Sequence, residues 1–135
     1  RVTNVIPGEV EIMFNFRYST ETTKEELKKK VNAILNSHKL NYSIDWSHSG
    51  YPFLTPQGVL VSACIDAIEK IKSIKPELST SGGTSDGRFI GQEGAQVVEL
   101  GPINATIHQI NESVLVQDLD DLTKIYSQIL TNLLV

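Results

Sequence analysis

The stretch from Val10 to Arg17 constrains the fold most, because its side chains follow a period of two. Four apolar residues, Val10, Ile12, Phe14 and Phe16, alternate with Glu11, Met13, Asn15 and Arg17. Successive side chains of a β-strand point to opposite faces of a sheet, so this pattern predicts a strand with one buried face. Such a strand needs neighbours along its edges and a layer over its apolar face.

A helix and a second strand are predicted to follow. Thr23 and Glu26 have the spacing of a capping box, in which each side chain satisfies a free amide at a helix start. Helical periodicity continues to about residue 38, and residues 41–47 alternate again. Two strands and one helix cannot cover their own edges and faces. We therefore expect this chain, which starts at Arg1 without an initiator Met, to be a fragment that lacks upstream elements or a partner.

The sequence Ser49-Gly50-Tyr51-Pro52 breaks the pattern and predicts a boundary between two domains, residues 1–49 and 50–135. In the second domain we expect a helix from about Gly58 and a last helix over 117–134. Between them we expect a strand at 78–80, a short helix at 86–92 and a buried strand at 96–100. Alternating helices and strands are typical of a parallel sheet with helices packed against it, so the predicted fold class is α/β.

Composition excludes several kinds of partner. The 135 residues carry a net charge of −4, and the basic run 28–30 follows two glutamates, which is typical of a solvated helix face. The single cysteine, Cys64, cannot form an internal disulfide. No apolar run approaches the roughly 18 residues of a membrane span. We expect a cytoplasmic protein that binds neither nucleic acid nor membrane.

A glycine-rich loop, Gly82-Gly83-Thr84-Ser85, lies between a predicted strand and a predicted helix. Amides at a helix start attract anions, and glycine allows an anion to approach closely. One interpretation is a cradle for a carboxylate or phosphate, with Thr84 and Ser85 as hydroxyl donors. The other is a tight turn in which Ser85 or Asp86 caps the helix. Composition alone favours the turn.

A second polar loop follows the predicted strand at 96–100 and contains Asn104 and His108. The carboxyl edge of a parallel sheet is where ligands bind, so His108 is either a metal ligand or base, or a hydrogen-bonded structural group. Glu112 could join it, but a zinc site requires three or four ligands. Arg17, at the end of the first predicted strand, is either an exposed charge or a bidentate clamp for a carboxylate.

Two segments, Ser81-Gly-Gly-Thr-Ser-Asp-Gly-Arg-Phe89 and Gly101-Pro-Ile-Asn-Ala-Thr-Ile-His-Gln-Ile-Asn-Glu112, closely resemble the succinyl-diaminopimelate desuccinylase family. Residues 3–9, 14–21 and 49–55 also look like this family. Its members are dinuclear zinc amidohydrolases of lysine and diaminopimelate biosynthesis. The resemblance implies that residues 1–49 are the C-terminal half of a ferredoxin-like lid or dimerisation domain. Residues 50–135 would be the C-terminal portion of a zinc-exopeptidase-like α/β catalytic domain.

The resemblance also implies roles for individual residues. His108 matches a zinc ligand, and Asn4 matches a lid residue near the partner subunit's active site. Substrate-binding positions are matched by Arg17, Ser49, Gly83, Thr84 and Asn104. The remaining metal ligands and the general base would lie upstream, so no catalytic residue is expected here, and the chain alone is expected to bind no metal and hydrolyse nothing. Leu115 departs from the small or polar residue of related sequences.

The implied whole enzyme is a homodimer with two zinc ions, or cobalt, in each active site. It would cleave N-succinyl-LL-2,6-diaminopimelate to succinate and LL-2,6-diaminopimelate. Two alternatives remain: a non-catalytic module for dimerisation and anion binding, and a related deacylase such as acetylornithine deacetylase. Metal ligands encoded upstream of Arg1 would exclude the first, and comparing succinyl with acetyl substrates would separate the second.

Overall fold

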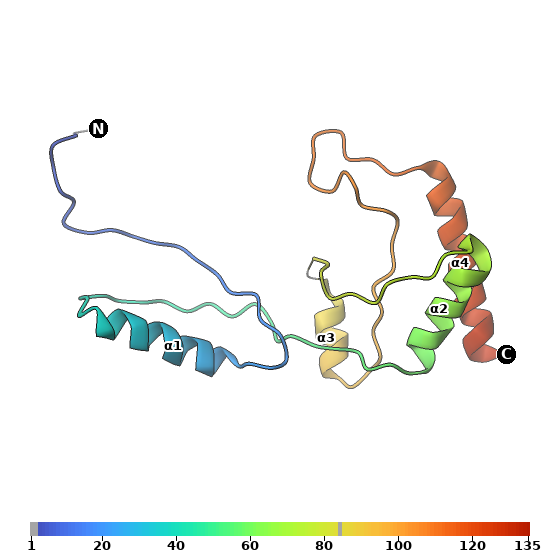
Figure 1. The fold of residues 1–135 in the computed structure, drawn as a ribbon, viewed down its shortest axis with the longest axis horizontal. Helices are drawn as coiled ribbons and strands as arrows, with labels where there is room; N and C mark the ends of the chain where they lie inside the picture. The colour runs from blue at the N-terminus through green and yellow to red at the C-terminus, as the bar shows by residue number, and fades with distance from the viewer. Residues whose placement is uncertain (1–2, 84) are drawn as a thin grey trace. The chain divides into compact units, whose positions relative to one another are not determined.

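The computed structural model describes residues 3–83 and 85–135 of the chain (Figure 1). Contacts divide the chain into two compact units, Arg1–Asp45 and Trp46–Val135. The domain boundary predicted after residue 49, from the break at Ser49-Gly50-Tyr51-Pro52, stays a prediction.

The first unit is built around helix α1 (Lys24–Ser37). The predicted capping box is confirmed: Glu26 N donates to Thr23 Oγ1 at 3.1 Å, and Thr23 N donates to Glu26 Oε2 at 3.2 Å. Hydrogen bonds from the Thr22 hydroxyl and the Thr23 amide lower the pKa of Glu26. After the helix the chain turns back along it, and the Tyr42 hydroxyl donates to Asn32 Oδ1 at 3.0 Å. No residue of α1 is fully buried: Leu27, Val31 and Leu35 are partly buried, and Ile34 is exposed.

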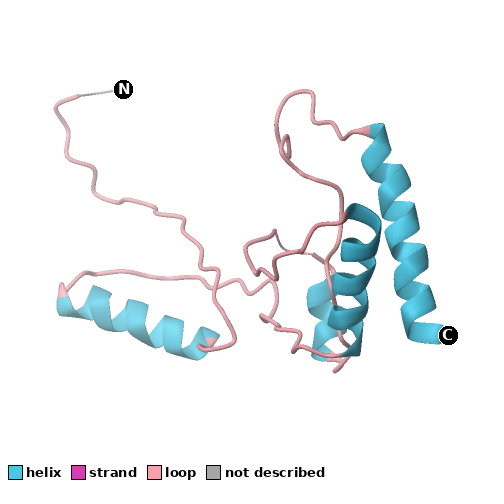
Figure 2. Ribbon diagram, turned by 45° about the vertical axis from the view of Figure 1, so that its right-hand side comes forward, coloured by secondary structure: helices cyan, strands magenta, loops and turns pink. Residues whose placement is uncertain are grey.

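The predicted α/β class, with its ferredoxin-like half-domain and parallel sheet, is wrong for this structure. No strand occurs in residues 3–83 and 85–135. Figure 2 draws the segments that were predicted as strands as loops between the helices. A period of two predicts which side chains share a face, but a strand forms only where a second backbone lies alongside at about 4.8 Å to complete the hydrogen bonds. Residues 10–16 have no such neighbour, and Val10 and Ile12 are 73% and 74% exposed.

The core of the second unit is the contact between α2 (Val59–Lys72) and α4 (Val116–Leu134), which lie side by side in Figure 2. Its buried members are small or β-branched: Ala63, Cys64, Ala67, Ile125 and Ile129. Cys64 is 6% exposed within this cluster, which confirms that its side chain fills space in the core, and burial raises the pKa of its thiol. Polar bonds border the core, and Asn132 Nδ2 donates to the Ala63 carbonyl at 3.2 Å.

Residues 96–100 lie beside this core without forming a strand. Val98 and Leu100 pack against it, while hydroxyl groups satisfy part of the backbone. Thr55 Oγ1 donates to the Val97 carbonyl at 2.6 Å and accepts from its amide at 3.1 Å. Leu60 N at the start of α2 donates to Gln96 Oε1 at 3.1 Å. Side chains therefore supply bonds that a neighbouring strand would otherwise make.

The short helix α3 (Gly87–Gln92) follows the glycine-rich loop. Gly94, with φ of +80°, lies just beyond its end. The proposed role of Asp86 as a capping side chain is not confirmed, because Asp86 makes no capping bond. Ser85 Oγ instead accepts from the Gly87 amide at 3.0 Å and donates to the Glu99 carboxylate. None of the four described helices is both long and apolar enough to cross a membrane.

Candidate functional site

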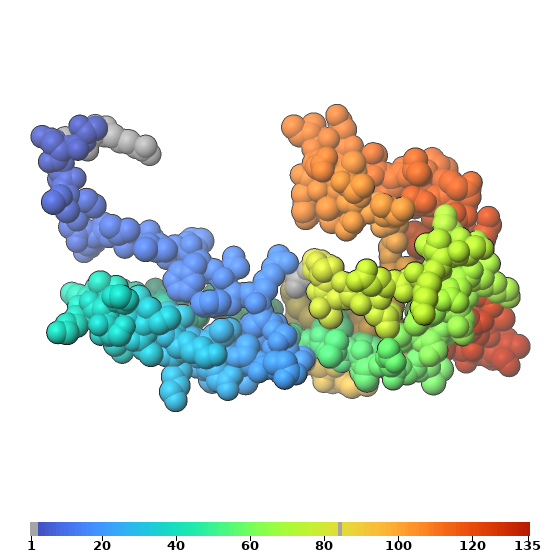
Figure 3. All heavy atoms as spheres, in the orientation of Figure 1, coloured from blue at the N-terminus to red at the C-terminus, as the bar shows by residue number. Residues whose placement is uncertain are grey.

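The loop that carries His108, residues 101–115, connects the 96–100 segment to α4 and stands out from the second unit (Figure 3, orange). The Thr106 side chain closes it. Thr106 Oγ1 donates to the Ser113 carbonyl and accepts from the Ser113 amide, both at 2.9 Å. Turn hydrogen bonds, such as Ile107 N to the Asn104 carbonyl at 3.0 Å, fill the interval. These bonds make the loop a locally closed unit.

His108 lies at an exposed position in this loop, in the left-handed region with φ of +62°. A residue with a Cβ rarely adopts this conformation without support. The support comes from Glu112, whose carboxylate accepts the His108 amide at 3.3 Å. The Glu112 carboxylate is therefore used by the backbone, and no described residue forms a hydrogen bond with the imidazole.

Zinc sites normally use three or four protein donors. Within the part of the chain that the structure describes, no three His, Cys, Asp or Glu side chains are grouped to hold a metal. An exposed imidazole fits the role of one ligand. The residues around His108 do not amount to a complete zinc site.

The glycine-rich loop is open at its tip. A Cβ placed on Gly82 or Gly83 would meet no atom within 4 Å, so the backbone there is accessible to an approaching anion. Before the tip, the hydroxyls of Ser79 and Ser81 share a hydrogen bond of 2.7 Å. Thr84, the other predicted donor of this loop, lies outside the described residues.

The structure brings together only some of the predicted site residues. Asn104 and His108 share one loop, and Ser49 is exposed in the same unit. No hydrogen bond or ion pair joins described residues 79–83 to the loop at 101–115. Arg17 and Asn4 are exposed residues of the first unit. Their predicted roles remain predictions.

One residue near these loops was missed by sequence analysis. Arg88, in the first turn of α3, has a buried Nε with no hydrogen-bond partner in the described structure. Its guanidinium carbon lies 4.7 Å from the centroid of the Phe89 ring. The available signal was a cation directly after a glycine-rich turn, to which the sequence analysis assigned no role of its own.

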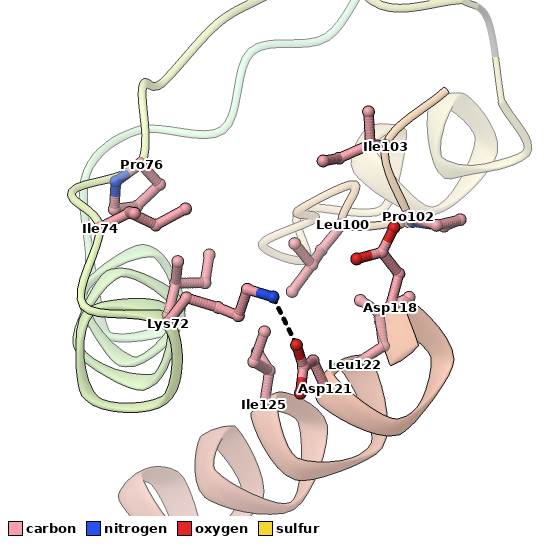
Figure 4. Close-up of a pocket in the computed structure, with 12 residues that line it drawn as sticks. Lys72, Ile74, Pro76, Leu100, Pro102, Ile103, Asp118, Asp121, Leu122 and Ile125 are labelled. Atoms are coloured by element: carbon pink, nitrogen blue, oxygen red, sulfur yellow. Dashed lines mark hydrogen bonds and ion pairs between the residues drawn. The ribbon is translucent and has the colours of Figure 1, made fainter. Parts of the chain in front are cut away.

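A separate apolar pocket of about 230 Å³ lies between the end of α2, the start of α4 and the segment 100–103 (Figure 4). Ile74, Pro76, Leu100 and Ile103 contribute apolar wall, and Lys72 reaches across to Asp121. None of the predicted site residues lines this pocket. Its lining includes Gly101, Pro102 and Ile103, the first residues of the His108 loop.

Comparison with known proteins defines the family. Residues 3–132 match the peptidase family M20/M25/M40, and the chain belongs to this family. It is 60% identical over 134 residues to a succinyl-diaminopimelate desuccinylase of Ruthia magnifica subsp. Calyptogena magnifica, covering 98% of this chain and 36% of that protein. It is 64% identical over 132 residues to the protein of the same name from Acinetobacter baumannii (strain AYE), covering 98% and 35%. The resemblance inferred from the two loops is confirmed, and the chain spans about a third of the length of these relatives.

Proposed function

We propose that this chain is part of a zinc-dependent amide hydrolase that releases succinate from N-succinyl-LL-2,6-diaminopimelate. The observation that carries this proposal is the identity of 60–64% to proteins named succinyl-diaminopimelate desuccinylase, sustained over 98% of the chain. Membership of a peptidase family agrees with amide hydrolysis.

His108 is the proposed zinc ligand of this chain. Its exposed imidazole and its backbone, fixed by Glu112, present one nitrogen donor on a closed loop. When bound, zinc lowers the pKa of a coordinated water and polarises the amide carbonyl. The other ligands and the general base would belong to the two thirds of the relatives' length that this chain does not span.

Gly83, Thr84 and Asn104 are proposed to hold carboxylates of the substrate, and Arg17 and Ser49 to bind it from the lid side of the site, Arg17 as a clamp for a carboxylate. The open backbone at Gly83 supports the first of these roles, since backbone amides without a covering side chain admit an anion. Guanidinium matches carboxylate geometry, which supports Arg17. The complete protein is proposed to be a cytoplasmic homodimer in which Asn4 lies near the partner subunit's site.

His108→Ala in the complete polypeptide tests the metal role. We expect about one zinc equivalent per chain to be lost, with turnover falling by more than the roughly 100-fold that loss of an outer-shell partner costs. Zinc content is measured by elemental analysis and turnover by release of succinate. His108→Gly should give the same result, because glycine suits the left-handed backbone and removes only the side chain.

His38→Ala is the matched control, since His38 is an exposed imidazole at the C-terminal end of α1. Full zinc content and near-normal turnover in both His108 variants would contradict the proposal. Turnover of an N-acetyl substrate in preference to the N-succinyl one would support a related deacylase instead.

A further inference from the structure

Arg88 occupies the junction between two segments with proposed substrate-binding residues. Its amide donates to the Ser85 carbonyl at 3.4 Å, directly after the glycine-rich loop. Its side chain runs over Gly50, the neighbour of Ser49. An ideal Cβ on Gly50 would lie only 3.0 Å from Arg88 Cδ and 3.3 Å from Nε. Arg88 therefore contacts both segments at once.

The guanidinium is fixed in place but not neutralised. Gly50 covers its stem, and Phe89 lies against its plane at 4.7 Å, the geometry of a cation–π contact. Among the described residues no carboxylate forms an ion pair with it. Its Nε is buried without an acceptor among the described residues.

Local stability does not account for an arginine at this position. A buried N–H without an acceptor is unfavourable, and an unbranched apolar side chain such as methionine would cover Gly50 without that cost. A guanidinium is always charged and presents paired donors to a carboxylate. A guanidinium whose stem is already held by its neighbours loses less conformational freedom when it binds an anion.

We propose that Arg88 is a substrate-binding residue that takes one carboxylate of the substrate and helps to set specificity for a polyanionic amide. The inference rests on the proposed function. It adds a second guanidinium to the predicted set, on a residue that contacts Gly50, next to Ser49, and whose amide bonds to Ser85 of the glycine-rich loop.

Arg88→Met in the complete polypeptide tests the proposal. Methionine retains the apolar stem over Gly50 and removes the charge. We expect KM for N-succinyl-diaminopimelate to rise about ten- to hundredfold, as loss of a charged hydrogen bond predicts, with kcat changed less than about threefold. Arg88→Lys should recover part of the loss. Lys75→Met, which removes an exposed charge in the connection after α2, is the control and should leave KM unchanged.

A merely structural role would not depend on which carboxylates the substrate carries. Three analogues, each with one carboxylate replaced by a neutral amide, make this distinction. The rise in KM caused by Arg88→Met should disappear for one analogue and persist for the other two. The analogue without the rise is the one that already lacks the carboxylate bound by Arg88. An equal penalty for all three analogues, or a KM within twofold of wild type, would overturn the role of Arg88. A wild-type protein without desuccinylation would reject the proposed function and this inference together.

Discussion

At the scale of single residues, the hydroxyl of Thr106 determines whether the His108 loop keeps its shape. Thr106→Val keeps the side-chain volume but removes both bonds to Ser113. We expect the loop to open more readily by about 1 kcal/mol, the usual net value of an intramolecular hydrogen bond. Amide hydrogen exchange at Ser113 should therefore accelerate about fivefold while exchange within α2 stays unchanged.

Thr123→Val is the matched control for this experiment. Its hydroxyl also donates to a carbonyl, that of Leu119 at 2.9 Å, but within the regular helix α4. This variant should leave the exchange rate of Ser113 at its wild-type value. Unchanged exchange in Thr106→Val would show that the turn bonds from 104 to 112 suffice to hold the loop.

Residue-level contacts could be predicted only where they are local in sequence. The capping box joins Thr23 and Glu26, which are three positions apart, so its spacing alone revealed it. The acceptor for Leu60 N comes from Gln96, thirty-six positions away, and no local pattern encodes that pairing. Arg88 was missed for the same reason, because its significance depends on contact with Gly50.

At the scale of elements, two polar side-chain contacts join α2 and α4 beside their small apolar core. Lys72 bonds to Asp121, and Lys70 Nζ donates to Gln128 Oε1 at 2.8 Å. The hydrogen bond from Lys72, followed by that from Gln117, lowers the pKa of Asp121, while the same bond to Asp121 raises the pKa of Lys72. Both pKa shifts indicate that packing of α2 against α4 favours the charged forms of Asp121 and Lys72 over their neutral forms.

Asp121→Asn should therefore destabilise the α2–α4 pair in a pH-dependent way. A lowered carboxylate pKa stabilises the fold above the ordinary value of about 3.9, and this contribution disappears as pH falls through the lowered pKa. A raised lysine pKa stabilises it below about 10.4, and this contribution disappears as pH rises through the raised pKa. The difference in melting temperature between variant and wild type should be largest between these limits and vanish at acid pH.

Asp120→Asn is the control for the contact between Lys72 and Asp121, because Asp120 is an exposed neighbour on the same helix. Circular dichroism melts from pH 2 to 11 provide the measurement. A deficit in Asp121→Asn that is equally large at pH 2 would mean that the carboxylate acts through packing and not through its charge.

Secondary-structure elements could be predicted where the sequence pattern that specifies them lies within the element itself. The positions of all four helices were anticipated to within a few residues, since helical hydrogen bonds and apolar stripes lie within one segment. The strand predictions at 10–17, 41–47, 78–80 and 96–100 were wrong because a strand depends on a second backbone. Val97 illustrates the difference, since the Thr55 hydroxyl satisfies its amide and carbonyl.

At the scale of the whole molecule, the chain exposes far more surface than a compact monomer of its mass. Its accessible area is 11561 Å², whereas a folded monomer of 14.9 kDa exposes about 7,000 Å². Large apolar side chains account for part of the excess, and Ile6, Met13 and Ile110 are each more than 90% exposed. The candidate metal site is also incomplete in this chain, since residues 3–83 and 85–135 contain no group of three metal-binding side chains.

This excess predicts how the isolated chain behaves in solution. Exposed apolar surface binds hydrophobic dyes, so the 135-residue chain should enhance the fluorescence of ANS several-fold over a compact monomer of equal mass at neutral pH. The complete polypeptide should show a much smaller enhancement per chain, because its other segments would cover these side chains. Far-UV circular dichroism on the same samples separates this outcome from unfolding, since the helices α2 and α4 should persist in both. Dye fluorescence no greater than that of the compact monomer, with the helices intact, would contradict this prediction. It would mean that the isolated chain covers its apolar side chains by itself, either by rearranging or by self-association. Sedimentation would distinguish these two explanations.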